Sequence, residues 1–212
     1  MKKFKALLVV ACALLLVAAS VFGTMAYLTS TDEVKNTFTV GKVNIKLDEA
    51  KANPDGSLVA NAARVKANSY KLLPGHTYNK DPMVTVLSGS ESSYVKMTVT
   101  FSKANELDAI FAPDGADLTS IFNGYDAANW TAKGNTKDVT ANTRTYEFWY
   151  KEAVGAPTAD VTLDALFDSI TVPGTITGEQ LATIADMTIT VNAYAIQADG
   201  FANAEAAWEA IK

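Results

Sequence analysis

Side chains that catalyse reactions or hold metals are scarce in this chain. His76 is its only histidine and Cys12 is its only cysteine. A single histidine excludes a zinc site built on two imidazoles of one subunit, and neither an HExxH helix nor a GxSxG turn occurs. His76 follows a Pro-Gly turn, where we expect an exposed or capping side chain rather than a catalytic base. The sequence therefore predicts no catalytic residue and no cofactor.

Two clusters of acidic and small polar residues are the remaining candidates for a metal site, and the metal would be calcium. They comprise Asn53, Asp55 and Gly56, and Asp114, Gly115 and Asp117. Neither cluster has the spacing of an EF-hand loop, and Asp-Gly pairs more often form simple turns. We therefore expect turns at both places and no bound metal.

The first 26 residues have the layout of a signal peptide. Three lysines within residues 1–5 precede an apolar stretch at 6–22. Thr24 and Ala26 supply the small residues that a signal peptidase requires before a cut between Ala26 and Tyr27. An uncleaved membrane anchor is the alternative, because the 17 residues of that stretch approach the ~20 needed to cross a bilayer. We predict that the mature chain begins at Tyr27.

The mature chain, residues 27–212, is long enough for one domain with a substantial core. Its formal net charge changes from −5 to −8, because the leader carries three lysines and no acid. Nucleic acid and anionic membranes are poor partners for that charge. Cys12 leaves with the leader, so strand pairing and packing must stabilise an exported protein without a disulfide. No other apolar stretch approaches membrane-spanning length, so we expect no membrane contact after processing.

Alternating apolar and polar residues predict a set of antiparallel strands. The clearest alternation runs over residues 94–101, and the same pattern recurs at 187–196. Aromatic residues favour a further strand at 143–151. Another apolar run at 83–87 is followed by Ser88-Gly89-Ser90, which suggests a hairpin with the strand at 94–101.

Helical patterns are few and short. Residues 104–111 fit one helix, and residues 177–184 fit another, with Thr177 and Gln180 in capping-box spacing. Residues 203–212 fit a closing helix that docks on the sandwich through one apolar face, made of Ala204, Ala207, Trp208 and Ile211. Long loops are expected at 48–69 and 112–142, the second folded over a sheet edge. These elements predict a single all-β domain built as an antiparallel β-sandwich.

The strand pattern changes phase soon after the predicted cleavage site. Phe38 and Val40 lie in one phase, whereas the apolar residues of 43–47 lie in the other, and Gly41 separates them. A glycine at such a slip indicates a bulge that bends one long strand or lets it pass between two sheets. An ordinary turn between two short strands explains the pattern equally well.

Four segments at the two ends of the mature domain form a recognisable set. They are residues 23–26 (GTMA), 38–45 (FTVGKVNI), 73–75 (LPG) and 191–197 (VNAYAIQ). As a set they resemble the TasA and camelysin family of secreted Gram-positive proteins, and the middle of the chain is unmatched. The resemblance implies a jelly-roll sandwich and a leader processed by a SipW-type signal peptidase. For TasA itself it implies assembly into the fibres of a biofilm matrix.

In such fibres the freed N-terminal strand of each subunit inserts into the sheet of its neighbour. For this chain the resemblance implies that residues 27–40 are the donor strand. Its apolar anchors would be Tyr27, Leu28, Val34, Phe38 and Val40, with Gly41 at its end. A head-to-tail contact of this kind does not close by twofold symmetry, so it extends into a filament. The alternative is that residues 27–36 form a loose tail and residues 38–47 a strand of their own sheet.

Three functions follow from these observations. The leading hypothesis is a secreted, non-enzymatic fibre subunit at the extracellular matrix or cell surface, with itself as partner and accessory matrix proteins as further partners. The short chain and unmatched loops also allow a minor or accessory matrix component. A surface adhesin or glycan-binding module would use the aromatic loop around Trp130. A metalloprotease follows only from the description of camelysins, and no zinc motif in this chain supports it.

Overall fold

The structure is a computed structural model, and it describes residues 41–111 and 122–211. The strands are β1 (Ile45–Asp48), β2 (Thr77–Asn79), β3 (Met83–Val86), β4 (Ser93–Ser102), β5 (Phe122–Asn123), β6 (Trp130–Asp138), β7 (Thr143–Tyr150), β8 (Val161–Thr162), β9 (Ser169–Thr171) and β10 (Ile189–Gln197). The helices are α2 (Ala104–Phe111), α3 (Gly178–Thr183) and α4 (Ala204–Glu209).

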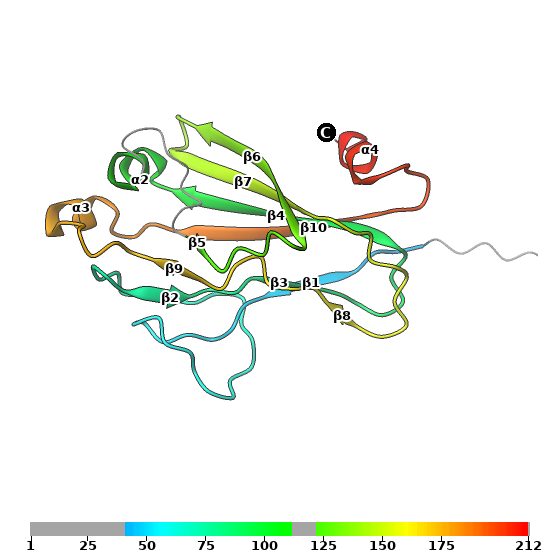
Figure 1. Ribbon diagram of the computed structural model, residues 1–212, viewed down its shortest axis with the longest axis horizontal. Helices are drawn as coiled ribbons and strands as arrows, with labels where there is room; N and C mark the ends of the chain where they lie inside the picture. Colours follow the sequence, from blue (N-terminus) through cyan, green and yellow to red (C-terminus); the bar gives the residue numbers. More distant parts are fainter. Residues whose placement is uncertain (1–40, 112–121, 212) are drawn as a thin grey trace, which may run out of the picture. The chain divides into compact units, whose positions relative to one another are not determined.

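The strands form two layers with one core between them (Figure 1). One layer is a four-stranded sheet in the order β10-β4-β7-β6. The other consists of two three-stranded sheets, β1-β3-β8 and β2-β9-β5. Every pair of strands is antiparallel. The predicted all-β sandwich with a few short helices is confirmed.

The alternation in β4 supplies the centre of the core. Val95, Met97, Val99 and Phe101 are fully buried, whereas the residues between them face away from the core. Aromatic rings continue the core across the layers, because Phe101 stacks on Phe122, whose ring centroid lies 4.3 Å from that of Phe167 in the segment before β9. Every second side chain of β4 is apolar and buried on the same face, and this burial holds the four-stranded sheet against the facing layer.

Two sequence-based expectations about the strands are wrong. The hairpin between residues 83–87 and 94–101 does not form, because β3 pairs with β1 and β8 whereas β4 pairs with β10 and β7. The intervening segment crosses from one layer to the other, and Ser90 Oγ accepts from Asn44 N–H there. The loop expected at 112–142 contains β6, whose mostly exposed residues give no alternating pattern.

The predicted helices are present with nearly the expected bounds. Thr177 and Gln180 form the complete capping box at the start of α3. α4 begins after Asn203, which accepts from Ala206 N–H, and it buries Trp208 against the outer face of the four-stranded sheet. Ile211 was expected on the docked face, but it lies beyond the helix and is 60% exposed.

Candidate strand-binding groove

Among the described residues, strand β10 is paired on one side only, and we call its other side the open side. Ser102 N–H donates to Thr188 C=O, and Ala198 N–H donates to Ser92 C=O, at the two ends of the β10–β4 ladder. In an antiparallel pair these bonds alternate with residue number, so the even-numbered residues of β10 bond to β4. The N–H and C=O groups of Ile189, Val191, Ala193 and Ala195 therefore point away from β4. Within the described residues, no hydrogen bond reaches these groups.

The same odd-numbered residues carry the apolar side chains of β10. Ile189, Val191, Ala193 and Ala195 pack against the core but are only partly buried. Their neighbours in β4 on the same face are completely buried. The sandwich is thus incompletely covered along the side where the backbone of β10 is also unpaired. An extended segment added there would satisfy both deficits at once.

The opposite edge of this sheet, at β6, has features that prevent strand addition. Its pairing with β7 is interrupted by a bulge between Ala132 and Gly134, and Gly134 has a φ of +106°. Lys133 and Lys137 also lie on this strand. Bulges and lysines are common protections of edge strands, because both oppose pairing with another chain. β10 contains no charged residue, proline or glycine, so the two edges of the sheet differ sharply.

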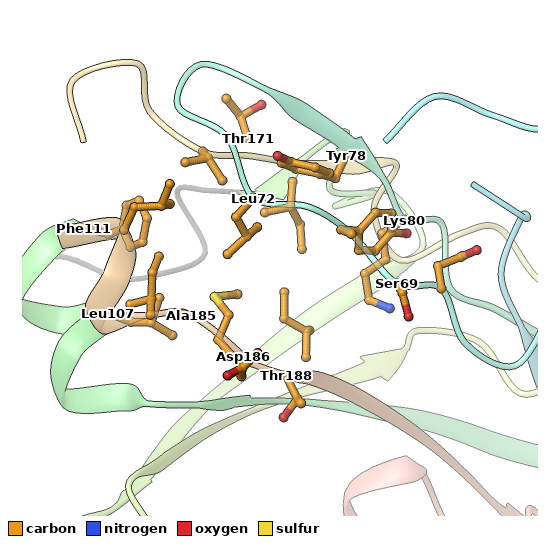
Figure 2. A pocket seen from close by; sticks show the side chains of 18 of the residues that line it. Ser69, Leu72, Tyr78, Lys80, Leu107, Phe111, Thr171, Ala185, Asp186 and Thr188 are labelled. Carbon is orange, nitrogen blue, oxygen red and sulfur yellow. The ribbon is translucent and has the colours of Figure 1, made fainter. Parts of the chain in front are cut away.

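Two cavities extend along the open side of β10, and we call them together the edge groove. The larger has a volume of about 960 Å³, and Figure 2 shows Leu72, Leu107 and Phe111 among the side chains that surround it. The smaller has a volume of about 390 Å³. They share Ala67, Asn68, Lys80 and Ile189 as lining residues, so the two cavities adjoin each other along residues 187–191.

Strand β1 borders the smaller cavity from the facing layer. Leu47 of β1 lines it, as do residues 189–191 of β10. Leu87 N–H donates to Asn44 C=O, so even-numbered residues of β1 bond toward β3 and odd-numbered ones point away. Lys66 Nζ donates to the outward Leu47 C=O. Glu49, the next outward residue, exchanges both backbone hydrogen bonds with Val65, so this edge of β1 is partly occupied. The outward sides of β1 and β10 therefore border one groove.

An ionic cluster fixes the segment that forms the outer wall of the groove. Arg64 Nε lies 2.5 Å from Asp48 Oδ1, and Arg64 Nη1 lies 2.8 Å from Asp81 Oδ2. Beside them the buried pair Lys80 and Glu49 has an N–O distance of 2.6 Å. Every charge in this cluster has a partner, so no buried charge is left unpaired. The cluster can therefore hold in place the segment 48–69, which the sequence predicts to be a loop.

The electrostatics of the cluster depend on Asp48. Burial opposes ionisation of its carboxyl, but hydrogen bonds from Lys46 and Arg64 outweigh burial and hold the pKa of Asp48 below its ordinary value of 3.8. The carboxylate is therefore charged at neutral pH, and its pairing stabilises the fold. This contribution is fully present above the unfolded pKa and is lost as the pH falls through the lower, folded pKa.

Replacing Asp48 by asparagine should lower the free energy of unfolding at pH 7 by about 2 kcal/mol, because Arg64 loses one of its two carboxylates. Urea unfolding at several pH values tests this. The difference between wild type and Asp48→Asn should narrow as the pH falls below 3.8. A difference that stays constant down to that pH range would contradict the assigned role.

The residues predicted for processing and assembly lie mostly outside the described residues. This applies to Ala26, Tyr27, Leu28, Val34, Phe38 and Val40. Gly41 is described and exposed, and a Cβ added there would lie 2.8 Å from Glu91 Cγ, so a larger residue would require the Glu91 side chain to move. Residues 43–47 show the predicted one-sided burial. The choice between a bulge and a turn at Gly41 depends on Phe38 and Val40 and stays open.

The other candidate sites do not gain support from the structure. His76 is exposed, as expected. Asp55 accepts hydrogen bonds from the N–H and Oγ of Ser57. Residues 53–57 therefore form a simple turn, which was the alternative to a calcium site. The second calcium candidate, Asp114, Gly115 and Asp117, lies outside the described residues. Among the described residues no group of three His, Cys, Asp or Glu side chains could hold a metal. Trp130 is 1% exposed and donates to Asp164 C=O, so its ring cannot stack on a glycan.

The described residues form an antiparallel β-sandwich with a groove beside its edge strand β10. No family model matches the chain, and no curated protein or solved structure matches it. None of the helices in residues 41–111 and 122–211 has the length and hydropathy to cross a bilayer. The groove itself was not predicted from the sequence, because the alternation at 187–197 is equally typical of a central strand.

Proposed function

We propose that this chain is a secreted, non-enzymatic subunit of extracellular fibres, as its resemblance to the TasA and camelysin family implies. Export removes residues 1–26, and residues 27–40 of one subunit then add as a strand to β10 of the next. The observation that carries the proposal is the open edge of β10, which lacks charge and has only partly buried apolar side chains. β6 at the other edge carries a bulge and lysines instead.

The sequence of the donor segment supports this pairing. Leu28, Val34, Phe38 and Val40 all have even numbers, so in an extended strand they lie on one face. The opposite face carries four threonines among mainly polar residues. This matches β10, whose odd-numbered residues are apolar and whose outer face includes Thr190 and Asn192. A segment whose aliphatic residues and Phe38 share one face can therefore cover the groove with that face and present the other face to solvent.

The energetics also favour addition over solvent exposure. Each main-chain hydrogen bond to β10 contributes about 0.5–1.5 kcal/mol. Burial of side chains such as Phe38 contributes about 1.5–3 kcal/mol for each residue that is fully covered. The donor strand of one subunit fills the groove of a second subunit. The groove of the first subunit remains available for the donor strand of a third. The contact is head-to-tail and extends without closure.

The alternative functions have less support. A glycan-binding module was based on Trp130, and that ring is buried. An accessory matrix component would use the same groove and differs only in which chain supplies the strand. A metalloprotease requires a group of metal ligands, and within the described residues no group of three His, Cys, Asp or Glu side chains could hold a metal ion. The fibre subunit is the function that uses the open edge of β10.

The secreted form of the chain tests the proposal. The protein should be collected from the medium of a Gram-positive host that carries the matching signal peptidase, and its N-terminus sequenced. We expect a start at Tyr27 and filaments in electron micrographs. A start at Met1, or processed protein that remains as single particles at high concentration, would contradict the proposal.

A further inference from the structure

The edge groove has an ionic section beside a mainly apolar one. The charged residues that line the smaller cavity are Asp48, Glu49, Lys66 and Lys80, and the larger cavity is lined by Lys80 and Asp186 among mainly apolar side chains. Asp48 is paired with Lys46 and Arg64, and Glu49 is paired with Lys80. Lys66 differs, because its ammonium donates to Leu47 C=O and no carboxylate among the described residues lies within ion-pair distance of it. Lys66 is also exposed.

Beside this section the residues are mainly apolar. Toward the start of β10, Leu107, Phe111 and Met187 line the larger cavity, and Asp186 is the one acid there. Toward the end of β10, beyond both cavities, Ala193 and Ala195 pack against the core. A strand that lies along β10 thus meets mainly apolar side chains before and after Lys66.

The donor segment has a complementary order of side chains. On the face that carries Leu28, Val34 and Phe38, the sequence reads Leu28, Ser30, Asp32, Val34, Asn36, Phe38 and Val40. Asp32 is the only charged residue of that face, because Glu33 and Lys35 lie on the other. It has an apolar residue four positions before it and another two positions after it. Asp32 is thus the one acid among the apolar residues of this face, and Lys66 is, among the described residues, the one unpaired cation of the groove section between the apolar residues along β10.

We propose that Lys66 of one subunit binds Asp32 of the incoming segment of a second copy, and that this ion pair sets the register of the inserted strand. The proposal rests on the proposed function and names the partner residues of its groove. A slip by one residue would turn the polar face of the segment inward. A slip by two residues keeps the same face inward but moves the Asp32 carboxylate away from Lys66, toward the acid Asp186 in one direction or toward the apolar Ala193 and Ala195 in the other. Lys66 therefore selects one register among those that the apolar anchors allow.

Charge reversal in the full-length secreted protein tests the pair. The variants are Lys66→Glu, Asp32→Lys and the double variant, with Lys71→Glu as a matched control, because Lys71 is exposed on the same segment but does not line the groove. Each single variant places like charges at every interface, and we expect the concentration needed for filament growth to rise roughly tenfold or more. The double variant should assemble nearly as wild type does, and Lys71→Glu should be unaffected.

Mixing the two single variants separates pairing between subunits from pairing within one chain. In an equimolar mixture, the unchanged Asp32 of the Lys66→Glu variant meets the unchanged Lys66 of the Asp32→Lys variant. At the next interface the two substituted side chains meet, and they also carry opposite charges. We expect growth to return, with the two variants alternating along the filament. Rescue by the double variant without rescue by the mixture would contradict binding to a second copy.

Further controls make failure informative. Thermal unfolding of Lys66→Glu should match wild type, and Lys66→Gln should impair growth less than Lys66→Glu does. If wild type forms filaments and neither single variant alters growth, the ion pair is wrong and strand addition stands. If wild type remains as single particles, strand addition itself fails, and this inference fails with it.

Discussion

An Ala193→Pro variant is expected to fold and to be exported, yet to form no filaments. The N–H of Ala193 points toward the open edge of β10, because the even-numbered neighbours bond to β4. Proline removes this N–H, and its ring occupies the space that an added strand would need. Proline is tolerated on an edge strand where the lost N–H faces solvent, so the β10–β4 ladder should survive.

Asn192→Pro is the matched control for this prediction. Asn192 is paired with Thr98, and its N–H is directed at β4. Its loss should lower the free energy of unfolding by roughly 2 kcal/mol, because a ladder bond is removed and its acceptor is left unsatisfied. Thermal unfolding and electron microscopy of both variants test the pair. Filaments from Ala193→Pro as abundant as those of wild type would show that another surface receives the strand.

Deletion of residues 27–33 is expected to abolish filaments as completely as Ala193→Pro does. The deletion removes Leu28 and Asp32 from the inward face of the proposed donor, and it shortens the donor from the 14 residues 27–40 to the seven residues 34–40. The described sandwich is untouched, so circular dichroism and the unfolding midpoint should not change. The measurement is filament yield in electron micrographs. N-terminal sequencing verifies that the signal peptidase still cuts the shortened protein after Ala26.

Substitutions on the outward face of the same segment supply its control. Thr29→Ser together with Thr31→Ser keeps the length and the apolar face, so filament yield should equal that of wild type. A synthetic peptide of residues 27–40 should also slow the growth of wild-type filaments by occupying free grooves, and a scrambled peptide should not. A filament yield from the deletion variant equal to that of wild type would contradict the donor role of this segment.

The sequence was sufficient to predict elements whose residues alternate or carry a cap. β4, β7 and β10 alternate because one face lies on the core, and Thr177 with Gln180 identifies the start of α3. β6 was missed because seven of its nine residues are exposed and give no period. β2, β8 and β9 have two or three residues each, which is too short for a period to appear.

The groove could not be predicted because edge position depends on pairing. The alternation in β10 resembles that of the central strand β4, and both were interpreted as central strands. Only the pairing order places β10 at the edge. The same limitation led to the wrong hairpin between β3 and β4, since Ser88-Gly89-Ser90 is compatible with a tight turn and with a crossing between layers. Lys66 carries no sequence signal at all.

Hydrogen exchange of the β10 amides, measured in single subunits and in filaments, is the most direct test of strand addition. The even-numbered residues should be protected in both states, because they bond to β4. The amides of Val191, Ala193 and Ala195 should exchange quickly in single subunits and become protected in filaments. Protection of these three amides in single subunits already, or fast exchange of all three in filaments, would contradict the account.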